Sequence, residues 1–284
     1  MAEDPRAVET MKFKTVEIDL NRPPVAHLYL NLPSRRNALS LDSFAEISAA
    51  ISALDRHPDV LAVVVSGRGT QFCSGIDLSA LETIVSSAGS TATDPGRSRE
   101  RLRRQILSLQ AALSAFEGCR KPVLAAVDGS CIGAGVDLVS ACDLRYCTRA
   151  ASFVVKEVDL AIAADLGTLQ RLPRIVGYGN AAEMALTARS VSAAEAKEMG
   201  LVSRVFDSRE EMEVGVRAIA EEICKKSPMA VMGTKAVLLK SRDVSVEQGL
   251  DYAATWNSGM LISDDLQEAI KAFIQKRKPT FAKL

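Results

Sequence analysis

Two runs of consecutive aliphatic residues place the strongest restriction on the fold of this chain. Residues 61–65 read LAVVV and residues 123–127 read VLAAV. Because neither run alternates with polar residues, each predicts a strand whose two faces are both covered, as in the parallel sheets of α/β proteins. Each run is also followed by a glycine-containing segment and then by residues with helical spacing. The sequence therefore predicts an α/β fold with a largely parallel sheet.

The N-terminal segments alternate between polar and apolar side chains. Residues 14–20 and 25–30 predict two half-buried strands that are joined by the turn Asn21-Arg22-Pro23-Pro24. We interpret His27, which lies inside the second strand, as a packed strand residue rather than a ligand. Further predicted elements are a helix at residues 41–54 with Ser40 as its N-cap, and short strands at 144–147 and 152–154.

The character of the chain changes near residue 192, where helical periodicity takes over. We place the boundary between a core at residues 1–200 and a helical region at residues 201–284. Earlier in the chain, the small and polar segment 85–100 predicts a mobile surface loop. The helices predicted after the boundary cover residues 210–226, 229–240, 246–256 and 264–276.

The composition excludes several classes of protein. The 35 basic residues are balanced by 35 acidic ones, so the chain has no general attraction for nucleic acid or anionic membranes. No run approaches the roughly 20 apolar residues of a membrane helix, and the N-terminus lacks the apolar region of a secretory signal. Two histidines are too few for a three-histidine zinc site, and we expect no metal. The six cysteines form no CxxC pair, which favours buried, reduced thiols: Cys73, Cys119, Cys131, Cys142, Cys147 and Cys224.

Two glycine-containing turns are candidates for binding an anionic oxygen. Residues 71–78 (QFCSGIDL) and 128–138 (DGSCIGAGVDL) each lead from a predicted buried strand into a helix. Small residues let a ligand approach the main chain, and the N–H groups at a helix N-terminus point at whatever anion is present. Two such groups that meet at one oxygen would form an oxyanion hole. Each turn could equally be a tight connection without a ligand.

The segment Gly177-Tyr178-Gly179-Asn180-Ala181-Ala182 superficially fits a dinucleotide-binding motif. The residues before it have helical spacing, so the strand that such a motif requires is missing. We interpret this segment as a helix break followed by a new helix.

Three acids are the best candidates for chemistry. Asp137 follows the second glycine turn, Glu157 follows a short predicted strand, and Asp165 lies in the apolar stretch LAIAADL. Burial of a carboxylate among alanine and leucine raises its pKa toward the range useful for proton transfer. The alternative for Asp165 is the N-cap of the following helix. We interpret Asp143 as a structural acid that starts a strand or pairs with an arginine.

These segments resemble the enoyl-CoA hydratase/isomerase (crotonase) superfamily over residues 15–281. Three motifs resemble its paired signatures: residues 71–78, 133–138 (GAGVDL) and 141–146 (ACDLRY). Residues 155–159 (VKEVD) and 163–173 (AADLGTLQRLP) resemble the Δ3,5-Δ2,4-dienoyl-CoA isomerases of that superfamily. The hydratases use two glutamates, whereas here the first position is Asp137, and they carry glycine where Asp165 stands.

The resemblance implies a spiral of ββα units, followed by a C-terminal helical region that builds homotrimers or homohexamers. It implies an acyl-CoA substrate, with coenzyme A as part of the substrate and no separate cofactor. The N–H groups of Ile76 and Ala134 would form the oxyanion hole. Glu157 would remove a proton at C2 of a 3,5-dienoyl-CoA, Asp165 would donate one at C6, and Asp137 would orient or tune the pair.

The resemblance also implies residues that contact coenzyme A, with Lys276 reaching a neighbouring subunit's ligand. Two alternatives remain open, an enoyl-CoA hydratase in which Asp165 only caps a helix, and a catalytically silent acyl-CoA-binding member of the fold. The C-terminal Ala282-Lys283-Leu284 is similar to the S-K-L address, which predicts a peroxisomal import receptor as a partner and the peroxisome as the compartment. The predicted contacts are Arg35, Arg36, Gly75, Ile76, Asp77, Leu78, Gly133 and Lys276.

Overall fold

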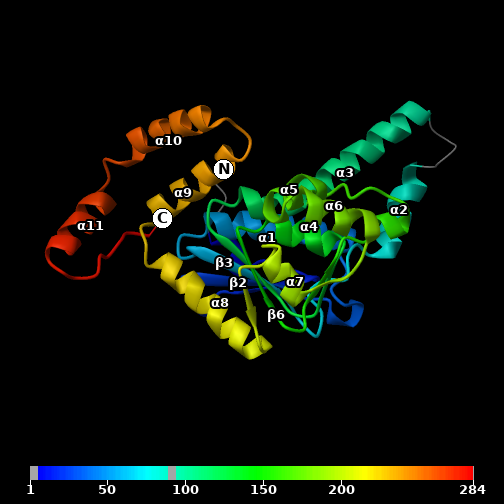
Figure 1. The fold of residues 1–284 in the computed structure, drawn as a ribbon, viewed down its shortest axis with the longest axis horizontal. Coiled ribbons are helices and arrows are strands. Elements are labelled where there is room, and N and C mark those ends of the chain that lie inside the picture. Colours follow the sequence, from blue (N-terminus) through cyan, green and yellow to red (C-terminus); the bar gives the residue numbers. More distant parts are fainter. Residues whose placement is uncertain (1–5, 89–93, 284) are drawn as a thin grey trace.

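A six-stranded sheet forms the centre of the molecule in a computed structural model that describes residues 6–88 and 94–283 (Figure 1). Its strand order is β1-β2-β3-β4-β6-β9, and every neighbouring pair is parallel except β1 with β2. The predicted α/β fold with largely parallel pairing is confirmed. The strands are β1 (Val16–Asp19), β2 (Val25–Leu30), β3 (Ala62–Gly67), β4 (Val123–Val127), β6 (Leu144–Thr148) and β9 (Arg204–Phe206).

Each buried strand sends alternate side chains into two separate cores. In β3, Val63 and Val65 pack into the core on the side of α1 (Leu41–Arg56) and α4 (Ala134–Ala141). Val64 points the other way, toward Val216 and its neighbours on α8 (Arg209–Cys224). The continuous aliphatic run is therefore explained by helices on both faces of the sheet.

A second, three-stranded sheet lies beside the glycine turns. It has the order β5-β7-β8, with β5 parallel to β7 and β8 antiparallel to it. The strands β5, β8 and β9 and the short helix α7 (Ala193–Glu198) were not predicted. The strands of this sheet are β5 (Ser130–Ile132), β7 (Ser152–Val154) and β8 (Val191–Ser192).

The predicted loop at residues 85–100 is wrong over most of its length. The helix α2 (Leu78–Ala88) covers its beginning, and α3 (Pro95–Gly118) covers its end. Residues 89–93 lie outside the described residues. The signal for α3 was Asp94 before Pro95, because the Asp94 side chain accepts the Arg97 N–H at 3.0 Å and proline is favoured in the first turn.

The other helices agree closely with the predictions. The Ser40 side chain caps α1 through the Ser43 N–H, and Gly177 separates α5 (Thr168–Val176) from α6 (Tyr178–Thr187), which confirms the predicted break. The remaining helical segments are the short turns Ala7–Glu9, Pro33–Arg35 and η3 (Glu157–Leu160), and the C-terminal helices α9 (Pro228–Ser241), α10 (Val246–Met260) and α11 (Asp264–Ile274).

Helix α9 contacts the core through the buried Lys235, and the helices after it extend away from the sheet. In Figure 1, α9, α10 and α11 form an arm, whereas α8 lies against the sheet. β9 also follows residue 200 yet pairs with β6, so the sheet draws on both sides of the predicted boundary. Among the described residues, no helix is long and apolar enough to cross a membrane.

The cysteines and Asp143 have the structural roles that the sequence predicted. All six cysteines are free, and all but Cys224 are buried. Asp143 precedes β6, where its Oδ2 accepts the Val123 N–H at 2.8 Å and pairs with Lys235 Nζ at 2.6 Å. Its ionic partner is therefore a lysine of α9 and not the predicted arginine.

Candidate active site

The two glycine turns lie against each other. Cys73 and Cys131 form a parallel bridge, in which the Cys73 N–H donates to the Ser130 carbonyl at 3.0 Å and the Ile132 N–H donates to the Cys73 carbonyl at 2.9 Å. The Gln71 side chain also accepts the Ser130 N–H at 2.8 Å. Two segments 58 residues apart in sequence are thereby held in one register.

Each turn leaves one N–H group available. Gly75 has a φ of +98° and Gly133 a φ of +51°, backbone conformations that favour glycine. Ile76 follows the first glycine, and Ala134 follows the second as the first residue of α4. Within residues 6–88 and 94–283, the N–H groups of Ile76 and Ala134 donate no hydrogen bond. Together they could hold one anionic oxygen.

A buried asparagine that the sequence reasoning missed supports the first turn. The Asn37 side chain accepts the Leu32 N–H at 2.9 Å and donates to the carbonyls of Arg68 and Gln71, both at 2.8 Å. Next to it, the Leu39 N–H donates to the Gly75 carbonyl at 2.8 Å. The only signal in the sequence was an asparagine in a loop, which is compatible with many other roles.

Glu157 lies against the second glycine turn. It begins η3, and a methyl group on Gly133 would lie 3.3 Å from Glu157 Oε1. The residue is only 9% exposed, and its Oε2 has no hydrogen-bond partner among the described residues. Burial, reinforced by repulsion from Asp137, raises the pKa of Glu157 to about 7. A carboxyl group with this pKa can both accept and release a proton near neutral pH.

Asp137 is buried more deeply, at 1% exposure on α4. Its Oδ1 accepts the Thr168 N–H at 2.6 Å, whereas its Oδ2 has no partner among the described residues. Because Gly167 at the N-cap of α5 offers no side chain, Asp137 supplies the capping oxygen from another helix. Burial raises the pKa of Asp137 to about 6, despite the opposing effect of Thr168.

Asp165 occupies a different environment from the one predicted. Ala164 and Leu166 are buried, while the Asp165 side chain between them is exposed, so the predicted burial is wrong for the single chain. The reason is that alternate side chains of an extended segment point to opposite sides, so a residue between two buried ones faces outward. Gln110 of α3 anchors this segment by donating to the Asp165 carbonyl at 2.6 Å.

The three carboxyl groups nevertheless influence one another. Partial desolvation raises the pKa of Asp165, and repulsion from Asp165 contributes to the raised pKa of both Asp137 and Glu157. The helix α5 starts at Thr168 with no capping bond from Asp165, so the alternative interpretation of Asp165 as an N-cap is wrong.

The predicted coenzyme A contacts fall into two groups. Arg35 and Arg36 lie beside the first turn, where Arg35 pairs with Asp77 at 2.8 Å and the Arg36 carbonyl accepts the Ser74 N–H at 3.0 Å. Leu78 starts α2 with its side chain exposed. Lys276 instead follows α11, and Figure 1 shows α11 at the far end of the C-terminal arm from α4 and α5.

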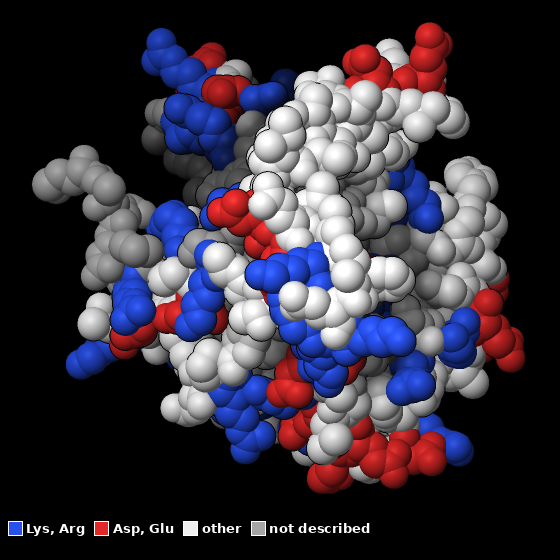
Figure 2. Space-filling model, turned by 90° about the vertical axis from the view of Figure 1, so that its left-hand side faces the viewer, with Lys and Arg blue, Asp and Glu red and all other residues white. Residues whose placement is uncertain are grey.

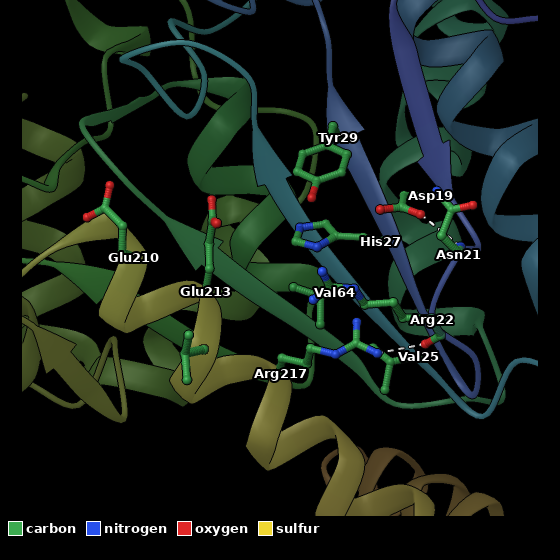
Figure 3. A pocket seen from close by; sticks show the side chains of 11 residues that line it. Asp19, Asn21, Arg22, Val25, His27, Tyr29, Val64, Glu210, Glu213 and Arg217 are labelled. Atoms are coloured by element: carbon green, nitrogen blue, oxygen red, sulfur yellow. Dashed lines mark hydrogen bonds between the residues drawn. The ribbon is translucent and has the colours of Figure 1, made fainter.

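A separate cavity of about 450 Å³ opens between β2 and α8 (Figure 3). His27 lies in its wall, stacks on Tyr29 with ring centroids 4.0 Å apart, and shares a 2.8 Å hydrogen bond with Ser66. Burial lowers the pKa of His27 to about 4, so the ring is neutral at physiological pH. His27 is thus a packed strand residue, as predicted, and none of the three acids lines this cavity. Among the described residues, no group of three or more histidines, cysteines or acids could hold a metal.

Known proteins resemble this chain over nearly its whole length. A family model described as enoyl-CoA hydratase/isomerase matches residues 21–283. The chain is 62% identical to the peroxisomal Delta(3,5)-Delta(2,4)-dienoyl-CoA isomerase of Arabidopsis thaliana, an alignment that covers 96% of this chain and 98% of the relative. It is 42% identical to the mitochondrial enzyme of that name from Mus musculus, over 99% and 86% of the two chains.

A solved structure shares the fold. The crystal structure of an enoyl-CoA hydratase from Bacillus anthracis matches with a TM-score of 0.85 and 31% identity, over 95% of this chain and 99% of that one. The glycine turns and acids described above therefore lie in a fold that this hydratase structure shares. The chain belongs to the enoyl-CoA hydratase/isomerase family.

Proposed function

We propose that this chain is a Δ3,5-Δ2,4-dienoyl-CoA isomerase, which acts in the β-oxidation of unsaturated fatty acids. The observation that carries the proposal is the third carboxyl group. Asp165 is close enough to raise the pKa of both Asp137 and Glu157, yet it caps no helix. The relatives of that name, at 62% and 42% identity over nearly the whole chain, support the same activity.

The reaction needs two proton transfers at distant carbons. Removal of a proton from C2 of the 3,5-diene gives an extended enolate, and protonation at C6 moves the double bonds to C2 and C4. Glu157, whose pKa is raised to about 7, would accept the first proton. Asp165, whose pKa is also raised, would deliver the second from the exposed side of the site. One carboxyl group could not serve both carbons without rearrangement.

The oxyanion hole would stabilise the enolate. As the C2 proton leaves, negative charge collects on the thioester oxygen, where the N–H groups of Ile76 and Ala134 could receive it. One such donor typically contributes about 3 kcal/mol to lowering the barrier. Because the reaction moves protons without net oxidation, it requires no redox cofactor, and we propose that coenzyme A enters only as part of the substrate.

Substitution of Gly133 tests the second glycine turn. We expect Gly133→Ala to lower kcat/KM for a 3,5-dienoyl-CoA by about 10²–10³-fold, the effect of losing one oxyanion donor. The added methyl group would press on Glu157 Oε1, and the backbone conformation at this position disfavours a side chain. Steady-state kinetics measure the loss. Gly179→Ala is the control, since nothing lies within 4 Å of its added methyl, and wild-type kinetics for Gly133→Ala would contradict the assignment.

A hydratase is the second candidate, favoured by the name of the similar crystal structure. In that case Asp137 and Glu157 would activate a water molecule, and Asp165 would have no catalytic part. A silent acyl-CoA-binding protein is the remaining alternative. In that case Asp137 and Glu157, each of which buries one oxygen without a hydrogen-bond partner among the described residues, would lower the stability of the protein without serving catalysis.

A spectrophotometric assay distinguishes these candidates. Purified protein is mixed with 3,5-octadienoyl-CoA, and the absorbance of the conjugated 2,4-dienoyl thioester is followed, with crotonyl-CoA hydration measured in parallel. Conjugation of the diene supports the isomerase. Hydration without conjugation would favour the hydratase, and binding without turnover of either substrate would favour the silent protein.

We infer that the C-terminal arm joins copies of the chain into a homotrimer or homohexamer. The arm exposes large apolar side chains, among them Phe273 at 86% exposure and Ile262 at 92%. Figure 2 shows a broad uncharged area on the side of the molecule where α10 and α11 lie. Assembly would cover this surface and could bring Lys276 to a neighbouring subunit's ligand. Light scattering after size-exclusion chromatography measures the assembly, and a monomer would contradict it.

We propose the peroxisome as the compartment, because one relative is named peroxisomal and the tail ends in Ala282-Lys283-Leu284. Other relatives are named mitochondrial. Ala282 and Lys283 are exposed, and Lys283 makes one ion pair, with Asp59 at 2.6 Å; Leu284 lies outside the described residues. An exposed pair of this kind is screened by solvent and weak, so a receptor could displace it.

We expect deletion of the last three residues to redirect the protein to the cytosol. The measurement is fluorescence microscopy of a fusion whose fluorescent domain precedes residue 1, so that the tail stays free. A matched fusion with the intact tail should co-localise with a peroxisomal marker. If the intact fusion remains cytosolic or enters mitochondria, the proposed import is wrong.

A further inference from the structure

Gly135 is a buried glycine whose backbone conformation does not require glycine. It is the second residue of α4, the helix that begins with Ala134. Unlike Gly75 and Gly133, it does not have a positive φ. Glycine also weakens a helix relative to alanine, because its backbone loses more conformational freedom on folding. Neither the backbone conformation nor helix stability therefore explains a glycine at this position.

The space around Gly135 explains the glycine. A Cβ atom at this position would lie 2.9 Å from the Cβ of Cys73, and 3.3 Å from the sulfur atoms of both Cys73 and Cys131. Carbon atoms that are not bonded to each other pack at about 3.5–4.0 Å, so a side chain at Gly135 would collide with Cys73. Both cysteines are fully buried in the core. The missing side chain thus lets the first turn of α4 pack directly on the two cysteines.

The two cysteines are also the residues that join the glycine turns. Their main chains form the parallel bridge described above, with hydrogen bonds of 3.0 and 2.9 Å from the N–H and to the carbonyl of Cys73. A Cβ atom is fixed by its main chain, whereas the end of a long side chain can rotate away from a clash. Since these bonds hold the main chain of Cys73, a methyl group on Gly135 would be accommodated by a displacement of α4 away from the first turn.

This displacement would separate the two candidate oxyanion donors. Ala134, which directly precedes Gly135, moves with α4, whereas Ile76 belongs to the first turn. We propose that Gly135 is a positioning residue, whose missing side chain brings the N–H groups of Ile76 and Ala134 close enough to hold one oxygen. Such donors act at about 2.7–3.1 Å from the oxygen, so a small displacement weakens one of them. Gly135 does not touch the substrate in this scheme, and the inference rests on the proposed oxyanion hole.

The polarisation of a bound thioester reports on the two donors without turnover. A conjugated 2,4-dienoyl-CoA absorbs at longer wavelength when hydrogen bonds draw electrons toward its carbonyl oxygen. We expect the wild-type protein to cause this red shift when it binds the product, and Gly135→Ala to lose most of it. The kcat of this variant for a 3,5-dienoyl-CoA should fall about 10–100-fold, less than for the loss of a whole donor. Gly179→Ala, whose added methyl meets nothing within 4 Å, is the control and should keep the shift.

A comparison of double variants separates the contact with Cys73 from a general destabilisation of α4. Cys73→Gly removes the Cβ atom that a methyl group on Gly135 would meet, whereas Cys73→Ala keeps it. Adding Gly135→Ala to Cys73→Gly should therefore leave the red shift as it is in Cys73→Gly alone. Adding it to Cys73→Ala should remove the shift, as in the wild-type background. These two pairs decide the question even if Gly135→Ala by itself does not fold.

The proposal is overturned if Gly135→Ala binds the product with the full red shift, or if the loss is equal in the Cys73→Gly and Cys73→Ala backgrounds. Absence of the shift in the wild-type protein would reject the oxyanion hole and this inference with it. A red shift in a wild-type protein that does not turn over 3,5-octadienoyl-CoA would leave the positioning role standing and refute the isomerase.

Discussion

Asp165→Asn is expected to abolish diene conjugation almost completely, lowering kcat for 3,5-octadienoyl-CoA by about 10²–10⁴-fold. Asparagine has the shape of aspartate but cannot deliver a proton to C6. The side chain is exposed, and Gln110 contacts the main-chain carbonyl of Asp165, so the substitution should change the free energy of unfolding by no more than about 0.5 kcal/mol. The measurement is the absorbance assay, with thermal unfolding alongside it.

Deuterium exchange at C2 shows which half of the reaction is lost. In Asp165→Asn, Glu157 remains, so the variant should still exchange the C2 proton of the bound substrate with solvent. Asp159→Asn is a suitable control, because Asp159 is also exposed and lies six residues earlier, where it pairs with Lys156. Wild-type conjugation in Asp165→Asn would remove Asp165 from the mechanism and leave the C6 donor unidentified.

The strands of the sheet were predicted well because the pattern that indicates each strand lies within a few neighbouring residues. The aliphatic residues of β3 and β4 alternate between two cores, and a continuous apolar run is the direct expression of that environment. The segment 85–100 failed because its small and polar composition outweighed one local signal, the Asp94-Pro95 pair that starts α3. Composition describes a segment on average, whereas a helix start depends on one or two residues.

The candidate site was predictable only in part, because some of its residues act through distant contacts. The three acids were found from their apolar surroundings and from motif resemblance. Asn37 contacts Gln71, and Thr168 contacts Asp137 from 31 residues away, and no periodicity reports such contacts. Asp165 shows a further limit, since an apolar stretch indicates burial of the segment but not which side chains point inward.

The three carboxyl groups lie in different environments, and these environments suit different catalytic roles. Asp137 is buried and held by one N–H, and Asp165 is exposed. Glu157 is buried, and its Oε2 has no hydrogen-bond partner in the described part of the chain. A buried carboxyl group with a raised pKa near neutrality suits a base that must also release its proton. An exposed group can recover a proton from solvent after each turnover. The geometry thus favours Glu157 as the base and Asp165 as the acid rather than the reverse.

Glu157→Gln should cause the second large loss, about 10²–10⁴-fold in kcat, and unlike Asp165→Asn it should also stop deuterium exchange at C2. Glutamine fills the same space but cannot accept the C2 proton. Because it also removes a carboxylate that must otherwise be buried, we expect a higher free energy of unfolding than wild type at pH 8. These results for the two variants would assign the first proton transfer to Glu157 and the second to Asp165.

The pH dependence of kcat/KM is an independent test of Glu157 as the base. With a pKa of about 7, Glu157 is mostly protonated below that pH and cannot act, so wild-type kcat/KM should rise as pH increases through 7. Because Asp137 and Glu157 repel each other, the measured midpoint belongs to the coupled pair. The residual C2 exchange in Asp165→Asn should also rise with pH, with its midpoint at a somewhat lower pH because the repulsion from Asp165 is lost. A rate that is flat between pH 5 and 8, or exchange that persists in Glu157→Gln, would assign the base to another group.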